Sequence, residues 1–177
     1  MKRHALFLLI VAASAAACLK LASHARAAAT RNMMLERIDD YRQTTWQWQS
    51  LMGVRLTPTH HTERRSTSSA YRAWVLKVWR RRAAQTRRLA AHPPHEGAWR
   101  CIQRYEAPWH AATGNGYYGG LQMDTGFQSR YGYDLLRRKG LAHRWSPTEQ
   151  MWVAERALRA GRGYYPWPNT ARICGLI

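Results

Sequence analysis

Ten residues, Thr113-Gly-Asn-Gly-Tyr-Tyr-Gly-Gly-Leu-Gln122, place the strongest constraint on what this chain of 177 residues can fold into. A helix cannot run through them, because a glycine in a helix interior costs about 1 kcal/mol relative to alanine. The Asn115-Gly116 pair is the sequence signal for the tight turn of a β-hairpin. We therefore expect a short hairpin here, with helices before and after it.

The segment before this run reads as a helix over about residues 98–105. Trp99, Ile102 and Glu106 are spaced i, i+3 and i+7, so the helix places them on one face. Pro108 ends it, because proline cannot continue a helix. Glu106 is thus expected at the C-terminus of the helix, on its buried face.

Helix boundaries are also visible after the run. Asp124 is expected to cap a short helix, and another helix near Leu135 is expected to end at Gly140. The strongest signal is Ser146-Pro-Thr-Glu149, a capping box with proline in the first helical position. Its helix is predicted to continue to about residue 160, with Gly161 as its stop. Residues 96–177 are therefore predicted to form a compact α+β, mostly α domain with one short β-hairpin.

Residues 30–95 form a basic segment rich in tryptophan and arginine, predicted to be helical and to contain a linker over residues 57–69. After the linker, one helix face carries an apolar stripe made of Tyr71, Trp74, Val75, Val78 and Trp79. Packing on the following domain is the commoner fate of such a stripe. The alternative is that residues 70–90 adhere to an anionic cell wall or membrane surface.

The first 29 residues have the layout of a secretory signal peptide. A basic start precedes an apolar run from Ala5 to Leu19, and small residues follow up to Ala29. The apolar run of about 15 residues is short for a membrane span, which needs about 20. A retained anchor and a lipidated Cys18 are the alternatives. We expect a secreted, extracellular or cell-wall-associated monomer.

The formal net charge is +18, from 28 Lys and Arg against 10 Asp and Glu, and the sequence pI is about 11.0. Such a charge predicts association with polyanions. Export argues against nucleic acid as the partner and permits disulfide bonds. Cys101 and Cys174 remain once Cys18 leaves with the signal, an even number that suits one bridge. His60 and His61, and His92 and His95, form two loose pairs without carboxylate or cysteine partners, so neither a metal nor another cofactor is expected.

Glu106 is a solitary carboxyl group between aromatic residues and a glycine-rich loop. A glycosidase general acid must hold a proton near neutral pH and release it to the leaving oxygen. Tyr105 and Trp109 would limit hydration of the anion, and the helix C-terminus would disfavour it. An ordinary exposed glutamate at a helix end is the alternative.

The pattern Trp99…Glu106…Trp109…Thr113–Gln122 resembles the catalytic domain of the resuscitation-promoting factors. These are secreted actinobacterial proteins that cleave peptidoglycan, related to lytic transglycosylases and having a lysozyme-like fold. Ala154-Glu-Arg156 and Trp167-Pro168 are also similar, so the resemblance covers about residues 96–175. It implies that Glu106 is the general acid and base. The residues that would line the sugar cleft are Trp109, Thr113, Asn115, Tyr117, Tyr118, Gly120 and Gln122.

The chain departs from the family in two places. The family usually has Cys-Glu-Ser-Gly-Gly-Asn-Trp, whereas this chain has Tyr105-Glu-Ala-Pro-Trp109, a loop shorter by two residues. The first cysteine has moved to Cys101, and the second lies at Cys174, farther past Trp167-Pro168 than in the family. Since both cysteines have moved, the resemblance implies a relocated Cys101–Cys174 disulfide.

A second carboxylate would be Asp124, although helix capping explains this residue as well. Without one, lytic transglycosylase chemistry stays open, in which the sugar supplies its own nucleophile. The expected function is cleavage of the β-1,4 bond between N-acetylmuramic acid and N-acetylglucosamine in peptidoglycan strands, by a lytic transglycosylase or a muramidase. The alternatives are a non-catalytic wall-binding module and an extracellular polyanion-binding protein acting through residues 70–90.

Overall fold

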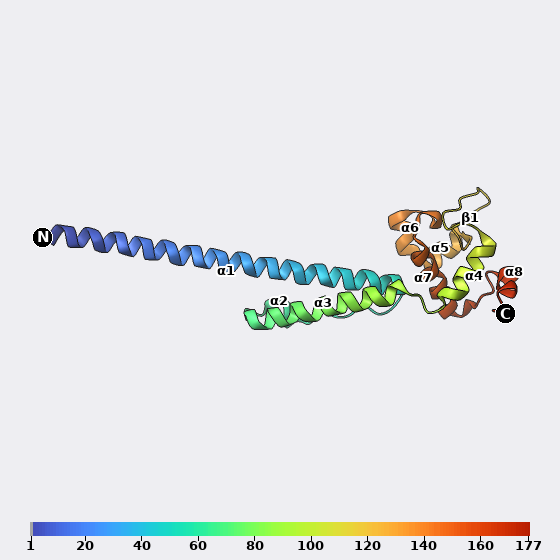
Figure 1. Ribbon diagram of the computed structural model, residues 1–177, viewed down its shortest axis with the longest axis horizontal. Coiled ribbons are helices and arrows are strands. Elements are labelled where there is room, and N and C mark those ends of the chain that lie inside the picture. The colour runs from blue at the N-terminus through green and yellow to red at the C-terminus, as the bar shows by residue number, and fades with distance from the viewer. Residues whose placement is uncertain (1) are drawn as a thin grey trace. The chain divides into compact units, whose positions relative to one another are not determined.

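The computed structural model describes the backbone of residues 2–177 and the side chains of residues 22–177 (Figure 1). The chain divides into two compact units. The first contains the residues up to Gln43 together with Pro58–Arg81, and the second contains Thr44–Thr57 and Arg82–Ile177. Two helices, α1 (Lys2–Met52) and α3 (Ser69–Ala91), contribute residues to both units.

The predicted signal peptide falls on the N-terminal part of α1. The side chains of residues 1–21, including Cys18, lie outside the described ones, so the signal peptide and its alternatives stay predictions. Within the part of the chain that the structure describes, no helix combines the length and the apolar character needed to cross a membrane.

The first unit is built from α1, α2 (His61–Arg65) and the first half of α3. Its buried apolar side chains are Ile38, Val75 and Trp79. The linker predicted over residues 57–69 is not wholly irregular, because α2 lies inside it and buries Glu63. Composition alone did not reveal this helix, because all five of its residues are polar. Its buried residue, Glu63, is paired with Arg42, which lies 21 positions earlier in the chain.

The predicted apolar stripe on α3 is partly wrong. Val75 and Trp79 are buried, but Trp74 is 57% exposed and its ring lies 5.7 Å from that of Tyr71. Neighbouring residues on a helix point about 100° apart. A face centred on Val75 and Trp79 therefore turns Trp74 toward solvent.

The second unit places helices around a single two-stranded sheet. Strands β1 (Tyr117–Tyr118) and β2 (Met123–Asp124) are antiparallel, with Tyr117 opposite Asp124 and Tyr118 opposite Met123. The remaining elements are α4 (Glu96–Glu106), α5 (Thr125–Tyr131), α6 (Tyr133–Lys139), the 3₁₀ turn η1 (Ala142–Arg144), α7 (Pro147–Ala157), the π-helical turn η2 (Leu158–Arg162) and α8 (Pro168–Ile173). This arrangement confirms the α+β, mostly α class.

The core of the second unit forms around α7, which buries seven of its eleven residues. Trp99 and Trp167 pack edge to face with their ring centroids 5.3 Å apart. Trp152 donates through Nε1 to the carbonyl of Ala90 at 2.7 Å, which fixes the last turn of α3 in this core. Trp145 is also fully buried.

The predicted helix boundaries agree with the structure wherever the signal is local. Asp124 caps α5 by accepting from the Phe127 amide at 2.6 Å. Ser146 and Glu149 form the full capping box of α7. Gly140 ends α6 in the left-handed region, with φ of 78°. The helix that begins at Pro147 is α-helical only to Ala157 and then widens into η2.

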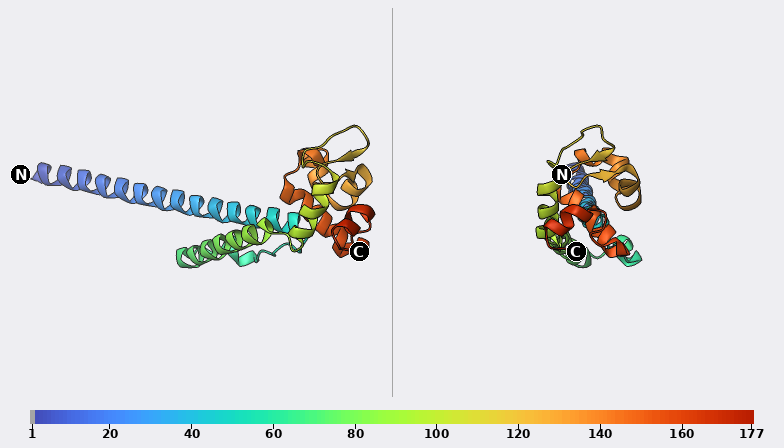
Figure 2. Two further views of the ribbon diagram at one scale, coloured as in Figure 1. Left: turned by 45° about the vertical axis from the view of Figure 1, so that its right-hand side comes forward. Right: turned by 90° about the vertical axis from the view of Figure 1, so that its right-hand side faces the viewer.

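The tight turn predicted at Asn115-Gly116 is wrong in position. Gly119–Gln122 connect β1 to β2, and both Gly119 and Gln122 have positive φ. Asn115 instead accepts from the Tyr117 amide through Oδ1 at 3.0 Å, a local turn inside the wider loop closed by an Ala112–Tyr118 bridge. This loop, just before β1, extends away from the helices of the second unit (Figure 2).

Candidate functional site

Glu106 is the last residue of α4 and is half-buried, as its spacing with Trp99 and Ile102 predicts. Both of those residues are fully buried, so they anchor the helix that carries the carboxyl group. Oε1 of Glu106 accepts a hydrogen bond from Oγ1 of Thr170 at 2.8 Å. Thr170 lies on α8, is 7% exposed and was not singled out from the sequence.

Glu106 differs from the other glutamates of the second unit in the kind of partner it has. Glu96 pairs with Arg100 at 2.7 Å, Glu149 with Lys139 at 2.7 Å, and Glu155 with His95 at 3.1 Å. Among residues 22–177, Glu106 forms no ion pair, and its hydrogen-bond partner is a neutral hydroxyl. A neutral hydroxyl can donate to a carboxylate or accept from a carboxylic acid, whereas a cation favours only the anion.

Two cross-links hold α4 and α8 together near this carboxyl group. The Cys101–Cys174 disulfide is present in the structure, with a Cα–Cα distance of 6.0 Å. Cys101 lies on α4 and Cys174 is the C-cap of α8, four residues after Thr170. The hydrogen bond from Thr170 to Glu106 is the second cross-link.

The start of α4 is held by a buried carboxylate that the sequence-based analysis did not assign a role. Glu155, on α7, is 1% exposed and accepts from the His95 amide and from Trp99 Nε1, each at 2.8 Å. Glu155 belongs to the Ala154-Glu-Arg156 motif, and this motif was the only feature of the sequence that pointed to the residue. Burial, and the charge of Glu155, raise the pKa of Tyr164, whose ring packs on Trp99. The helix that ends at Glu106 is thus fixed at both ends.

Arg156, the next residue of that motif, ties together distant parts of the second unit. Its guanidinium donates to the carbonyls of Ser50 and Leu51 at the end of α1, and to the carbonyl of Tyr131. It also pairs with Asp134 at 2.9 Å. Burial alone would raise the pKa of Asp134, but the hydrogen bond and charge of Arg156, with the charge of Arg138, lower it.

The short loop after Glu106 is closed by its own hydrogen bonds. Gln103 Nε2 donates to the Ala107 carbonyl at 2.8 Å, and the Ala107 amide donates to the Gln103 carbonyl at 3.2 Å. The carbonyl of Trp109 accepts from the Gly120 amide at 3.1 Å and from Gln150 Nε2 at 2.8 Å. The loop after Glu106 is therefore a defined turn that packs on the glycine-rich run.

Gly120 is the point of contact between this turn and the run. A Cβ atom there would lie 2.8 Å from the Trp109 ring and 3.0 Å from the Trp109 Cα, so only glycine fits. The amide of Gly120 is already bonded to Gln150 Oε1 at 2.8 Å. The structural role of Gly120 is to let the Trp109 ring and backbone pack closely against the glycine-rich run. Gln150, fully buried on α7, links both sides of this contact and was missed from the sequence.

The other predicted cleft residues lie in and around the loop before β1. Thr113 and Asn115 are exposed, as is Tyr117, of which 47% is accessible. Tyr118 is half-buried and packs against the hydrophobic core. Gln122 donates through Nε2 to the Gly119 carbonyl at 2.9 Å.

Asp124, the possible second carboxylate, is occupied as a helix cap. Its Oδ1 accepts from the Phe127 amide, and the residue is exposed. In residues 22–177, no three His, Cys, Asp or Glu side chains gather as a metal site requires.

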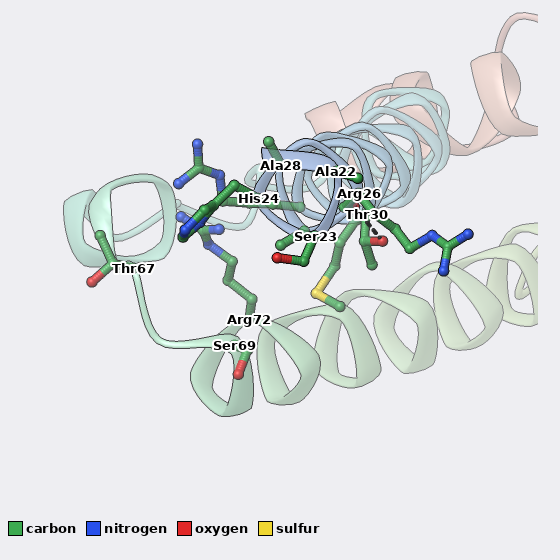
Figure 3. Close-up of a pocket in the computed structure, with 12 residues that line it drawn as sticks. Ala22, Ser23, His24, Arg26, Ala28, Thr30, Thr67, Ser69 and Arg72 are labelled. Atoms are coloured by element: carbon green, nitrogen blue, oxygen red, sulfur yellow. Dashed lines mark hydrogen bonds between the residues drawn. The ribbon is translucent and has the colours of Figure 1, made fainter. Parts of the chain in front are cut away.

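A cavity of about 1080 Å³ lies in the first unit, and none of the predicted site residues lines it. Figure 3 shows its walls, from α1 on one side and from residues 67–72 on the other. Of the described residues that line it, Arg26, Arg31 and Arg72 are cationic and none carries a carboxylate. Arg72 is 6% exposed, and its Nε has no hydrogen-bond partner.

The solvent-facing side of α3 is strongly basic. The exposed basic residues are Lys77, Arg80, Arg81, Arg87 and Arg88. The helix contains no acidic residue.

No family model matches the chain, and no solved structure matches it. Among characterised proteins, the chain is similar to Resuscitation-promoting factor Rpf1 of Corynebacterium glutamicum, with 38% identity over 68 residues. The match covers 38% of this chain and 34% of the relative, so the chain spans about a third of the relative's length. It supports a relationship to the resuscitation-promoting factors over part of the chain.

Proposed function

We propose that this protein is a secreted glycosidase that cleaves peptidoglycan, with Glu106 as general acid and then general base. The target is the β-1,4 bond between N-acetylmuramic acid and N-acetylglucosamine. The observation that carries the proposal is the setting of Glu106. It is a half-buried carboxyl group whose partner is the neutral hydroxyl of Thr170, and it lies close in the chain to the exposed aromatic and glycine-rich loop. The partial similarity to a resuscitation-promoting factor supports the same function.

The reaction needs one group that works in both directions. In the first step the Glu106 carboxylic acid gives its proton to the glycosidic oxygen as the C1–O bond breaks. In the second step the Glu106 carboxylate takes a proton from the nucleophile that attacks C1. The second step restores the acid, so the proton balance closes without a cofactor.

We favour the lytic transglycosylase form of this reaction, in which the 6-hydroxyl of the muramic acid residue is the final nucleophile. The support is the capping role of Asp124, which gives that carboxylate a structural role already. A lysozyme-type reaction commonly uses two carboxylates flanking the bond. The product is then a 1,6-anhydro sugar rather than a reducing end.

The sugar would be held by the residues named from the resemblance. Trp109 and Tyr117 offer aromatic faces for pyranose rings, and Trp109 is held by the Gly120 contact. Thr113, Asn115 and Gln122 offer donors and acceptors for the N-acetyl and hydroxyl groups. The basic side of α3 would raise the local concentration of the protein at an anionic wall, in a salt-dependent way.

The test is digestion of purified peptidoglycan by the full chain and by Glu106→Gln, with the released muropeptides identified by mass spectrometry. Glu96→Gln is the matched control, because Glu96 lies on the same helix and pairs with the surface residue Arg100. We expect 1,6-anhydro-muropeptides from the wild type and from Glu96→Gln, and none from Glu106→Gln. Reducing-end products would instead establish hydrolysis, and release by Glu106→Gln would exclude its role as the acid.

The second candidate is a glycan-binding module without turnover. The observation in its favour is the shortened turn between Glu106 and Trp109, which changes the family's catalytic loop. In that case neither the wild type nor Glu106→Gln releases muropeptides, while both sediment with insoluble peptidoglycan. The Trp109→Ala variant should then no longer sediment with insoluble peptidoglycan.

A further inference from the structure

We infer that Thr170 is a positioning residue for Glu106, holding its carboxyl group in one orientation in both the protonated and the ionised state. This inference rests on the proposed acid–base role of Glu106. Thr170 lies in Pro168–Ile173, between Trp167 and the displaced Cys174, where this chain departs from the family pattern.

The hydroxyl of Thr170 has two acceptors within reach. Oγ1 lies 2.8 Å from Glu106 Oε1 and 3.4 Å from the carbonyl oxygen of Trp167. When Glu106 is ionised, the hydroxyl donates to its carboxylate, which is the arrangement in the structure. When Glu106 is protonated on Oε2, the hydroxyl still donates to Oε1, and the proton faces away from Thr170 and is free for transfer. When Glu106 is protonated on Oε1, rotation about the Cβ–Oγ1 bond lets the hydroxyl donate to the Trp167 carbonyl and accept a hydrogen bond from the carboxyl group. In each of these arrangements the Thr170 hydroxyl stays hydrogen-bonded to Glu106.

A group that serves both states suits a residue that must be acid first and base second. An arginine or lysine in the place of Thr170 would favour the anion and oppose the acid step. An apolar residue would leave a half-buried carboxyl group free to rotate between the two steps. The hydroxyl therefore fixes orientation while leaving the proton available.

The surroundings of Thr170 make this contact a rigid one. Thr170 is 7% exposed, and the next residue, Ala171, is fully buried. Trp167, which provides the second acceptor, is anchored through Nε1 to the Leu121 carbonyl at 2.6 Å. The disulfide at Cys174 fastens the other end of α8 to α4. The hydroxyl thus approaches Glu106 from a helix fixed at both ends.

The test compares Thr170→Val, which removes the hydroxyl with little change of shape, with Thr170→Ser, which keeps it. Thr86→Val is the matched control, because Thr86 is also a buried threonine of the second unit and its hydroxyl donates to backbone carbonyls of α3. We expect Thr170→Val to lower kcat by on the order of 10-fold with little change in KM. Thr170→Ser should recover most of the rate, and Thr86→Val should leave kcat unchanged.

A pH–rate profile separates positioning from a general loss of structure. A hydrogen bond donated to a charged carboxylate is stronger than one shared with the neutral acid, so its loss costs the ionised form more, and the alkaline limb for Thr170→Val should move to higher pH. Thr170→Ser should keep the wild-type profile. An unchanged kcat and profile for Thr170→Val would overturn the inference, as would a serine variant as slow as the valine variant.

A measurement without turnover keeps the inference separate from the proposed function. The ¹³C resonance of the Glu106 carboxyl carbon, assigned by its loss in Glu106→Gln, should change in Thr170→Val at both acidic and neutral pH and stay in place in Thr170→Ser. If the wild type releases no muropeptides, the proposed function fails and this resonance alone decides whether Thr170 holds the carboxyl group. An unshifted resonance in Thr170→Val would overturn the inference.

Discussion

Arg42 and Glu63 form a buried ion pair in the first unit, with Nη2 of the arginine 2.7 Å from Oε2 of the glutamate. The same Oε2 accepts from Trp79 Nε1 at 2.8 Å, and Nη1 of Arg42 pairs with Asp39. One carboxylate therefore joins side chains from α1, α2 and α3. This network is the main polar element in the core of the first unit.

Arg42 and Arg72 provide a matched pair for testing that network. Both are buried and the Nε of each lacks a hydrogen-bond partner among the described residues, but Arg72, unlike Arg42, forms no ion pair there. Arg42→Met leaves Glu63 buried without a counter-charge and should destabilise the first unit by about 3 kcal/mol. Arg72→Met removes an unpaired buried charge and should be neutral or stabilising by about 1 kcal/mol. Hydrogen exchange over residues 61–81 measures both, and equal losses would contradict the difference in pairing.

The ion pair also predicts how the first unit responds to acid. Burial alone would raise the pKa of Glu63, but hydrogen bonds from Arg42, Trp79 and the backbone at His60, with the charge of Arg42, lower it below 4.5. A carboxyl group whose pKa is lowered by folding stabilises the folded state when the pH is above the group's ordinary pKa. This stabilisation is lost as the pH falls through the lowered pKa. Protection of residues 61–81 should therefore decrease as the pH falls below 4.5 and through the lowered pKa of Glu63.

The control for this acid response is Glu63→Gln. This variant should be less stable than the wild type at neutral pH and should show a flatter pH dependence over the same range. A wild-type slope that persists in Glu63→Gln would assign the acid response to other carboxylates.

Asp124 can be assigned to capping or to catalysis by two substitutions. Asn caps a helix about as well as Asp, whereas Ala costs about 1 kcal/mol at such a position. We expect Asp124→Asn to retain stability and muropeptide release, and Asp124→Ala to lower the free energy of unfolding by about that amount. Thermal unfolding and product release are measured on the same samples. A stable Asp124→Asn protein that loses turnover would make Asp124 a catalytic carboxylate.

Gly120 should be intolerant of any side chain because of its contact with Trp109. Gly120→Ala forces the new Cβ into the Trp109 ring and backbone, so the ring must move. We expect lower stability and at least a several-fold weaker association with peptidoglycan, measured by sedimentation. Gly97→Ala is the control, because nothing lies within 4 Å of a Cβ there. In a helix this change should be neutral or slightly stabilising, and equal losses in both variants would exclude the steric explanation.

Sequence reasoning succeeded where the determining contacts are local. Asp124, Gly140 and the Ser146–Glu149 box act within one turn of helix, so their roles can be recognised from spacing. It failed at Asn115, because an Asn-Gly pair also forms a local turn through the asparagine side chain, and only the pairing of β1 with β2 decides between the two.

The residues that complete the candidate site depend on contacts far apart in the sequence. Thr170 reaches Glu106 across 64 positions, and Glu155 reaches Trp99 across 56. Neither belongs to a periodic pattern that predicts its partner. Arg42 and Glu63 illustrate the same limit in the first unit. The polar residues 57–69 give no sign that their one glutamate, Glu63, is buried. Cys101 and Cys174 were the exception, because they are the two cysteines that follow the predicted signal peptide and can form one pairing.

The bonds that Arg156 makes to the end of α1 bear on the order in which the chain can fold during synthesis. The carbonyls of Ser50 and Leu51 are made more than a hundred residues before the guanidinium that binds them. Until then the buried side chains of Leu51 and Met52 have no completed core to enter. The second unit therefore cannot close progressively behind the ribosome. Its first segment must wait, shielded or exposed, until α7 and Arg156 have been synthesised.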